Sequence, residues 1–192
     1  MIKLLFIRHG ATAGNLKQRY IGTTDEALCD VGIAQIAELK KHHFPIDSLF
    51  VSPMLRTRQT ADLLFPQMPY TLVNDFSETD FGLFEGKTAI ELSGCPEYQA
   101  WVESMCLAPI PQGESVKDFK IRCCVAFGEI IKSIPDGTCA AFVVHGGVIM
   151  SILEAYAQPK KDFYDYHIGN GEYIWGIYDE KRSHIRLKET QR

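Results

Sequence analysis

Short apolar runs alternate with amphipathic stretches along the chain, and no other feature limits the possible folds as strongly. Residues 2–7 form an apolar run broken only by Lys3, which is short enough for a buried strand. The candidate strands are residues 2–7, 48–51, 71–73 and 139–144. The candidate helices are residues 30–43, 56–65, 115–130 and 148–157. This alternation predicts an α/β fold, a three-layer sandwich with a mostly parallel central sheet flanked by helices on both faces.

Two segments depart from the simple alternation. Residues 174–178 and 185–187 predict a closing hairpin around Glu180-Lys181-Arg182. Residues 85–113 predict a small helical insertion near one end of the sheet, with a helix that begins at the capping-box sequence Thr88-Ala89-Ile90-Glu91. We therefore predict a single domain over residues 1–192, with this insertion as a candidate lid. The sequence leaves open whether the insertion moves on binding.

The bulk composition excludes several functional classes. Apolar residues make up 46% of the 192 residues and charged residues 23%, which provides for a substantial core. The net charge of −4 gives no electrostatic reason to expect a nucleic-acid or membrane partner. The six cysteines form no Cys-x-x-Cys pair, and every apolar run is shorter than the roughly 20 residues that span a bilayer. The N-terminal run also reaches Arg8 too soon for a signal peptide. We expect a cytoplasmic protein with free thiols.

Reactive side chains follow the predicted strands at the point where each strand ends. Arg8 and His9 come directly after the first strand, and His145 comes directly after the strand at residues 139–144. Arg56 and Glu78 lie a few residues past two other strands. Because ligands of open parallel sheets bind beyond the carboxyl ends of the strands, we expect these five side chains to converge at one edge of the sheet.

These residue types suit the chemistry of phosphate transfer. Two guanidinium groups offer planar forks that match phosphate oxygens and balance their charge. A neutral imidazole can attack phosphorus, and a second histidine can donate to the same oxygens. A carboxylic acid can protonate the leaving oxygen. None of these roles requires a metal ion or another cofactor.

Five ordered sequence blocks resemble the motifs of one family, the phosphoglycerate mutase-like branch of the histidine phosphatase superfamily. A single Arg-His-Gly would be weak evidence, but the five blocks occur in the expected order between residues 8 and 147. They are Arg8-His9-Gly10 with Thr12 and Asn15, residues 52–60, residues 76–82 with Glu85-Gly86, residues 111–115 and residues 144–147. Ala11, Phe76 and Phe84 depart from residues that are common in the family, and these changes bear on substrate and packing.

The resemblance implies a role for each matched residue. His9 would be the nucleophile that becomes phosphorylated, and Glu78 would be the proton donor that later activates water. Arg8, Arg56 and His145 would form the phosphate pocket, and Gly10 and Gly146 would let the backbone approach the phosphate. The residues implied to bind phosphate or substrate are Arg8, Gly10, Thr12, Asn15, Arg56, His145 and Gly146.

Structural explanations compete with some of these assignments. Asp80 and Glu85 are rivals of Glu78 for the acid role. The pair His42-His43 lies at a predicted helix end, where a basic side chain is favourable without any metal. Tyr98 and Trp101 either pack within the insertion or line the substrate pocket.

Three functions are compatible with these motifs. The first is a phosphatase for small-molecule phosphomonoesters. Its substrate would be α-ribazole 5'-phosphate, because within the family the chain most resembles the α-ribazole phosphatase group of cobalamin synthesis, or a broader set of sugar or nucleotide phosphates. The alternatives are a cofactor-dependent phosphoglycerate mutase and a non-catalytic protein that binds a phosphorylated ligand. The sequence leaves a homodimer open.

Overall fold

The computed structural model describes residues 1–188, which contain a seven-stranded sheet in the order β3-β2-β4-β1-β6-β7-β5. The strands are β1 Ile2–Arg8, β2 Ser48–Val51, β3 Thr71–Leu72, β4 Cys139–Val144, β5 Ala157–Gln158, β6 Tyr173–Asp179 and β7 His184–Leu187. Strands β3, β2, β4 and β1 pair in parallel, whereas β6 pairs antiparallel with both β1 and β7. The predicted closing hairpin is therefore confirmed as β6 and β7.

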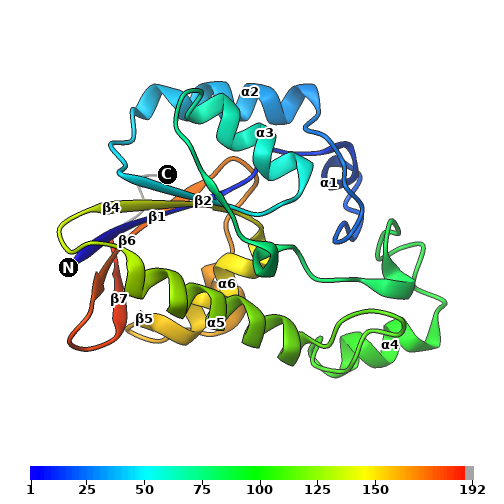
Figure 1. Cartoon of the computed structure of the whole chain (residues 1–192). Helices are drawn as coiled ribbons and strands as arrows, with labels where there is room; N and C mark the ends of the chain where they lie inside the picture. Colours follow the sequence, from blue (N-terminus) through cyan, green and yellow to red (C-terminus); the bar gives the residue numbers. More distant parts are fainter. Residues whose placement is uncertain (189–192) are drawn as a thin grey trace.

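Helices cover both faces of this sheet. They are α1 Ala13–Leu16, α2 Asp30–Leu39, α3 Leu55–Leu64, α4 Pro96–Glu103, α5 Val116–Ser133 and α6 Gly146–Tyr156. Helices α2 and α3 lie on one face, and α5 and α6 lie on the other (Figure 1). The predicted α/β sandwich with a mostly parallel sheet is confirmed. No helix within residues 1–188 is both long enough and apolar enough to cross a membrane.

Strand β1 is continuously apolar because both of its faces are covered. Successive side chains of a strand point to opposite faces of the sheet. Leu4 and Phe6 belong to the core on the α5 and α6 side, and Leu5 and Ile7 belong to the core on the α2 and α3 side. All four side chains are fully buried. Each contributes roughly 1.5–3 kcal/mol to stability relative to an exposed side chain.

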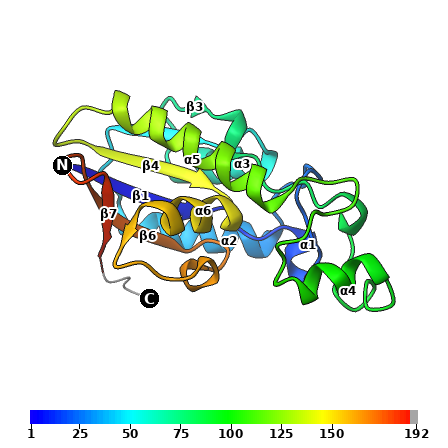
Figure 2. The same cartoon turned by 90° about the horizontal axis from the view of Figure 1, so that it is seen from below.

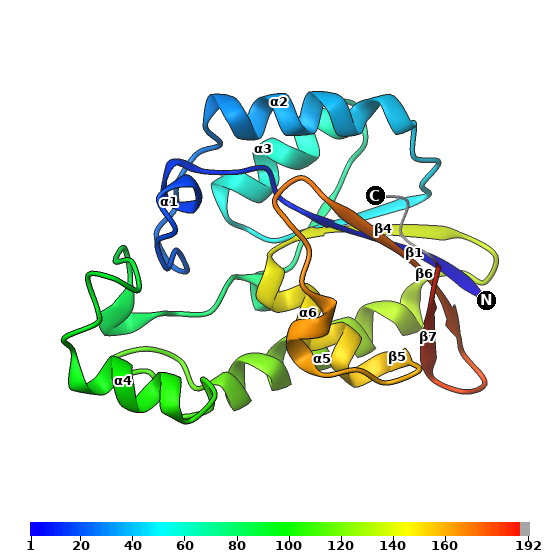
Figure 3. The same ribbon diagram turned by 180° about the vertical axis from the view of Figure 1, so that it is seen from behind.

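A third cluster of buried side chains lies apart from the sheet. Its buried members are Phe84, Leu92, Tyr98, Trp101 and Ile110, within and next to the predicted insertion. Helix α4 and its flanking loops project beyond the carboxyl ends of β1 and β4, on the same end of the molecule as α1 (Figures 2 and 3). The insertion thus has a small core of its own and stands next to the edge where Arg8 and His145 emerge.

The prediction of a helix that begins at Thr88 is wrong. The capping-box hydrogen bonds do form, because the Thr88 amide donates to Glu91 at 2.8 Å and the Glu91 amide donates to the Thr88 hydroxyl at 3.1 Å. Only a turn follows, and helix α4 begins at Pro96. Gly94 is a poor helix residue, and the residue before a proline is driven out of the helical region, so Cys95 is extended.

Candidate active site

The two histidines leave neighbouring strands at the same edge of the sheet. Residue Arg8 of β1 is in register with Val144 of β4, so His9 and His145 follow at the same level. The His9 amide donates to the Val144 carbonyl at 3.1 Å, which holds the two strand ends together. The imidazole centroids lie 5.1 Å apart with the rings at 66°, and both side chains are buried.

The environment of His9 sets both its charge and its tautomer. Nδ1 lies 2.7 Å from the Gly10 carbonyl oxygen, which only accepts hydrogen bonds, so Nδ1 carries the proton. Burial, followed by the Arg56 charge, lowers the pKa of His9 well below its ordinary value of 6.5. The ring is therefore neutral at pH 7, and the lone pair is on Nε2. This is the arrangement that a nitrogen nucleophile requires.

Ser52 orients His145 in a similar way. Nε2 of His145 lies 2.7 Å from the Ser52 hydroxyl, and Nδ1 is buried without a partner among residues 1–188. Burial and the Arg56 charge lower the pKa of His145, so this ring is also neutral. When Nε2 accepts from Ser52, Nδ1 carries the proton and can donate to an added oxygen. Ser52 belongs to one of the recognised sequence blocks, but its contact with His145 is visible only in the tertiary structure.

Arg56 is a buried cation that backbone carbonyls hold in place. The side chain is 1% exposed and lies in the first turn of α3, where Asp25 caps the Leu55 amide at 2.6 Å. Its guanidinium donates to the carbonyls of Thr24 at 2.9 Å and Gly22 at 3.0 Å. Within residues 1–188 it forms no ion pair with a carboxylate. Because guanidinium keeps its proton even when buried, this charge can bind an anion.

Arg8 lies across the N-terminus of α6. It donates to the Ile168 carbonyl at 2.7 Å and contacts Nε2 of His167 at 3.1 Å, while its Nε is buried without a partner among residues 1–188. A Cβ at Gly146 would lie 3.3 Å from the guanidinium carbon, so Gly146 leaves room for this crossing. Arg8 Nε is thus a hydrogen-bond donor that no group among residues 1–188 uses, and an anion can accept a hydrogen bond from it.

The rival acids Asp80 and Glu85 have structural partners. Oε1 of Glu85 accepts from the amides of Gly22 at 2.8 Å and Thr24 at 3.0 Å, so it shapes the loop whose carbonyls hold Arg56. Oδ1 of Asp80 accepts from the Gly82 amide at 2.9 Å. Neither carboxylate lines the cavity next to Arg8.

Glu78 does line that cavity, together with Arg8 and Gly147. Its carboxylate accepts from the Thr79 amide at 2.9 Å and from the Gly147 amide at 3.2 Å. A Cβ at Gly147 would lie 2.4 Å from Glu78 Oε1, so only glycine lets the carboxylate approach α6 this closely. Of the three acids in this region, Glu78 is the one that lines the cavity.

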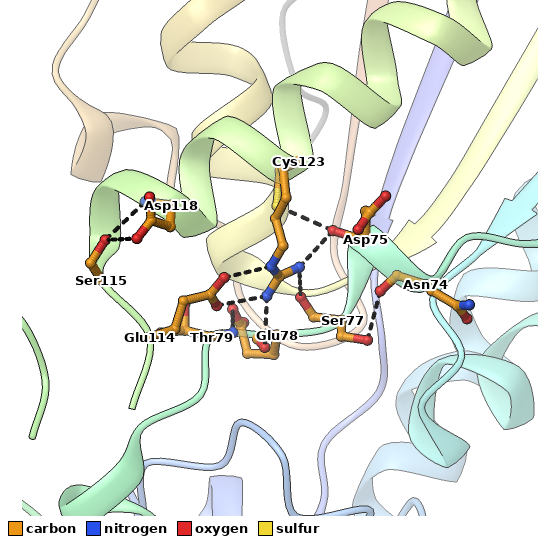
Figure 4. Close-up of polar contacts among 10 residues, drawn as sticks. Asn74, Asp75, Ser77, Glu78, Thr79, Glu114, Ser115, Asp118 and Cys123 are labelled. Atoms are coloured by element: carbon orange, nitrogen blue, oxygen red, sulfur yellow. Dashed lines mark hydrogen bonds and ion pairs between the residues drawn. The ribbon is translucent and has the colours of Figure 1, made fainter. Parts of the chain in front are cut away.

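Arg122 positions the segment that carries Glu78, and the sequence did not single it out. Its guanidinium pairs with the Glu114 carboxylate at 2.7 and 2.8 Å and donates to the carbonyls of Asp75, Ser77 and Glu78 at 2.6, 2.9 and 3.2 Å (Figure 4). Glu114 belongs to the recognised block at residues 111–115. This bidentate pair therefore connects that block to the candidate acid.

Thr12 and Asn15 stabilise the turn after His9. Thr12 caps α1, and Asn15 Oδ1 accepts from the Thr12 amide at 3.1 Å and from Asn170 Nδ2 at 3.2 Å. Asn170 also donates to the His9 carbonyl at 3.1 Å, a contact that the sequence did not predict. Gly10 also has a packing role that the sequence did not predict, because a Cβ there would lie 2.7 Å from the Gly32 carbonyl oxygen of α2.

The fold and this site define the class of the protein. A family model, described as histidine phosphatase superfamily (branch 1), matches residues 4–190, so the chain belongs to that superfamily. The 2,3-bisphosphoglycerate-dependent phosphoglycerate mutase of Nitrobacter winogradskyi is 28% identical over 163 residues, which cover 78% of each chain.

Solved structures resemble the chain over nearly its whole length. The α-ribazole phosphatase of Shigella flexneri has a TM-score of 0.87 at 23% identity. The alignment covers 99% of this chain and 96% of the Shigella chain. The phosphoserine phosphatase of Entamoeba histolytica, solved with 3-phosphoglyceric acid, has a TM-score of 0.84 at 25% identity, with the same coverage of 99% and 96%. The chain is thus similar to both phosphatases and mutases of the superfamily.

The two buried histidines make stability depend on pH. Because their pKa values are lowered from 6.5, the unfolded chain binds more protons than the folded chain once the pH falls below about 6.5. The free energy of unfolding is therefore fully retained above that pH and decreases as the pH falls toward the lowered values. Urea denaturation between pH 7.5 and 5 measures this slope, which we expect to be smaller in His9→Asn. An equal slope in the variant would contradict the assignment.

Proposed function

We propose that the chain is a phosphomonoester hydrolase that works through a phosphohistidine intermediate on His9. One observation carries this proposal: a neutral imidazole with its Nε2 lone pair available lies next to the guanidinium groups of Arg8 and Arg56, and neither of these forms an ion pair with a carboxylate among residues 1–188. Such a pocket attracts a dianion and places a nucleophile beside it. Arg8, Arg56 and His145 Nδ1 would bind the phosphate oxygens and balance their charge in the transition state.

The reaction follows in two balanced steps. The Nε2 lone pair of His9 attacks phosphorus, an N–P bond forms and the ester P–O bond breaks, while the leaving oxygen takes a proton from Glu78. A water molecule then gives a proton to the Glu78 carboxylate as its oxygen bonds to phosphorus. The N–P bond breaks, which restores the neutral imidazole and releases inorganic phosphate.

Glu78→Gln tests the acid role. We expect a loss of about 10²–10⁴-fold in kcat/KM on alkyl phosphates, which need a proton on the leaving oxygen, and a much smaller loss on p-nitrophenyl phosphate, whose leaving group needs none. Asp80→Asn is the matched control, because its carboxylate binds a backbone amide outside the cavity. Equal losses on the two substrates in Glu78→Gln would argue against proton donation.

The substrate is a second part of the proposal. Similarity to α-ribazole phosphatase favours α-ribazole 5'-phosphate, and a broader sugar or nucleotide phosphatase uses the same site. The mutase names of the sequence relatives favour a second candidate, a phosphoglycerate mutase that transfers the phosphoryl group instead of releasing it. A non-catalytic phospholigand-binding protein is the third candidate.

Phosphate release without added metal separates these candidates. The panel contains α-ribazole 5'-phosphate, 3-phosphoglycerate, sugar phosphates, nucleotides and p-nitrophenyl phosphate. We expect release that requires His9, with one compound well ahead of the others. Isomerisation of 3-phosphoglycerate only after addition of 2,3-bisphosphoglycerate would replace the hydrolase with the mutase. Binding of these compounds without release, isomerisation or phosphoenzyme would leave the non-catalytic protein.

A further inference from the structure

A largely apolar cavity of about 220 Å³ lies directly next to the proposed phosphate site. Its walls come from the loops at Tyr20 and at residues 78–81, the insertion, α5, α6 and the 3₁₀ turn at Phe163–Tyr166. The aromatic residues in these walls are Tyr20, Phe81, Trp101, Phe119, Phe163 and Tyr164. Because the cavity shares Arg8, Glu78 and Gly147 with the active site, it is where the leaving group of a bound phosphomonoester would lie.

Charge is confined to the catalytic end of this cavity. Among the residues that line it, Glu78 is the only acidic side chain and Arg8 is the only arginine or lysine, and the proposed chemistry uses both. The Tyr20 hydroxyl pairs with the Tyr98 hydroxyl at 2.8 Å, and burial together with this contact raises the pKa of Tyr20, so Tyr20 is uncharged. A carboxylate on the leaving group would thus lose water without gaining a cation.

Trp101 lines the cavity and has one hydrogen-bond donor that no group among residues 1–188 uses. Its side chain is 7% exposed, and Nε1 is buried without a partner among residues 1–188. An indole N–H only donates, and a buried donor left unsatisfied is costly. An acceptor on a bound molecule would remove this cost. The orphaned donor is independent of the aromatic character of the walls and also indicates a ligand.

We propose that the leaving group of the substrate is a flat, uncharged ring system with a hydrogen-bond acceptor for Trp101 Nε1. This inference rests on the proposed phosphatase function, since it assigns the part of the substrate that lies beyond the phosphate. Stacking against the aromatic walls binds the ring, and Trp101 selects rings with an acceptor at the correct edge. Small carboxylated phosphate esters are poor substrates of this site.

Matched ring systems test the role of Trp101. We compare 2-naphthyl phosphate with three quinolinyl phosphates that place the ring nitrogen at different edges. In Trp101→Phe, we expect the preference for at least one quinolinyl ester over the naphthyl ester to fall about threefold to tenfold. Trp175→Phe is the matched control, because Trp175 lies on β6 outside this cavity and its loss leaves the preference unchanged. Unchanged preferences for all three esters in a folded Trp101→Phe would overturn the role.

A second pair of substrates tests the exclusion of charge. We expect 4-carboxyphenyl phosphate to have at least about tenfold lower kcat/KM than phenyl phosphate. Val116→Lys would reduce this difference by adding a cation to the cavity wall, whereas Val116→Met, with a similar length and no charge, would not. Equal kcat/KM values for the two esters in the wild-type enzyme would overturn the neutral-pocket proposal.

Separate measurements test the proposed phosphatase function and the assignment of the leaving-group pocket. Hydrolysis of p-nitrophenyl phosphate that requires His9 reports on the proposed function. If that activity is absent, calorimetric titration with naphthylmethyl- and quinolinylmethylphosphonates still measures the pocket. Tighter binding of one quinolinyl compound, lost in Trp101→Phe, would support the pocket assignment without turnover. Equal binding of all four compounds would overturn it.

Discussion

Replacing His9 by alanine is expected to lower kcat/KM for phosphate release by at least about 10⁴-fold on every substrate of the panel. The reason is that the N–P bond cannot form, and water has no other activated route to phosphorus in this pocket. The structure also assigns the atom. Since Nδ1 donates to the Gly10 carbonyl, the phosphoryl group should be found on Nε2.

Rapid acid-free quenching and ³¹P NMR measure this intermediate. We expect a base-stable, acid-labile phosphoenzyme in the wild type, enriched in Glu78→Gln during turnover of p-nitrophenyl phosphate, because water attack then lacks its base. His42→Ala is the matched control, since His42 is exposed and lies outside the site. Phosphoenzyme that persists in His9→Ala, or a phosphoryl group on Nδ1, would contradict this mechanism.

Arg56→Met is expected to lower kcat/KM about a thousandfold while the chain remains folded. Methionine fills much of the volume but supplies neither the charge nor the fork that binds phosphate oxygens. A ligand that binds only the folded state raises Tm, so inorganic phosphate should raise the Tm of the wild type. The same phosphate concentration should leave the Tm of Arg56→Met nearly unchanged.

Arg58→Met is the control for this prediction, because Arg58 lies on the same helix but is not among the charges that lower the pKa values of His9 and His145. It should retain both activity and the Tm shift. An Arg56→Met enzyme with activity within tenfold of the wild type would mean that Arg8 and His145 alone bind the phosphate. Loss of the folded state, measured by circular dichroism, would move the test to Arg56→Lys, which keeps the charge and loses the fork.

The residues proposed to contact the substrate can be predicted from the sequence, but the residues that hold them in position cannot. His9 and His145 each follow an apolar run and precede a glycine, which is a local pattern. Arg122 lies on an amphipathic helix where an arginine is ordinary, and its contacts reach back to residues 75–78. Asn170 contacts His9 and Asn15 from more than 150 positions away. No local pattern marks such partners.

One correction and one unexpected packing contact have the same origin. The Thr88 capping box formed its hydrogen bonds without starting a helix, because Gly94 and Pro96 interrupt the segment after one turn. Gly10 was expected to let the backbone approach a phosphate, and it also lets the Gly32 backbone occupy the space of its missing Cβ. In each case the residue type was informative, but the structural role of the residue depended on other parts of the chain.

The α/β fold, the family and the candidate nucleophile can be inferred from the sequence, because hydrophobic periodicity and short motifs are local features that do not depend on distant contacts. Three properties require the folded structure: which acid lines the cavity, which nitrogen of His9 is available and what chemistry the cavity walls present. These properties depend on burial, on distances between remote segments and on which hydrogen bonds are already made. A linear pattern specifies residue types, but only packing determines the electrostatic environment in which each one acts.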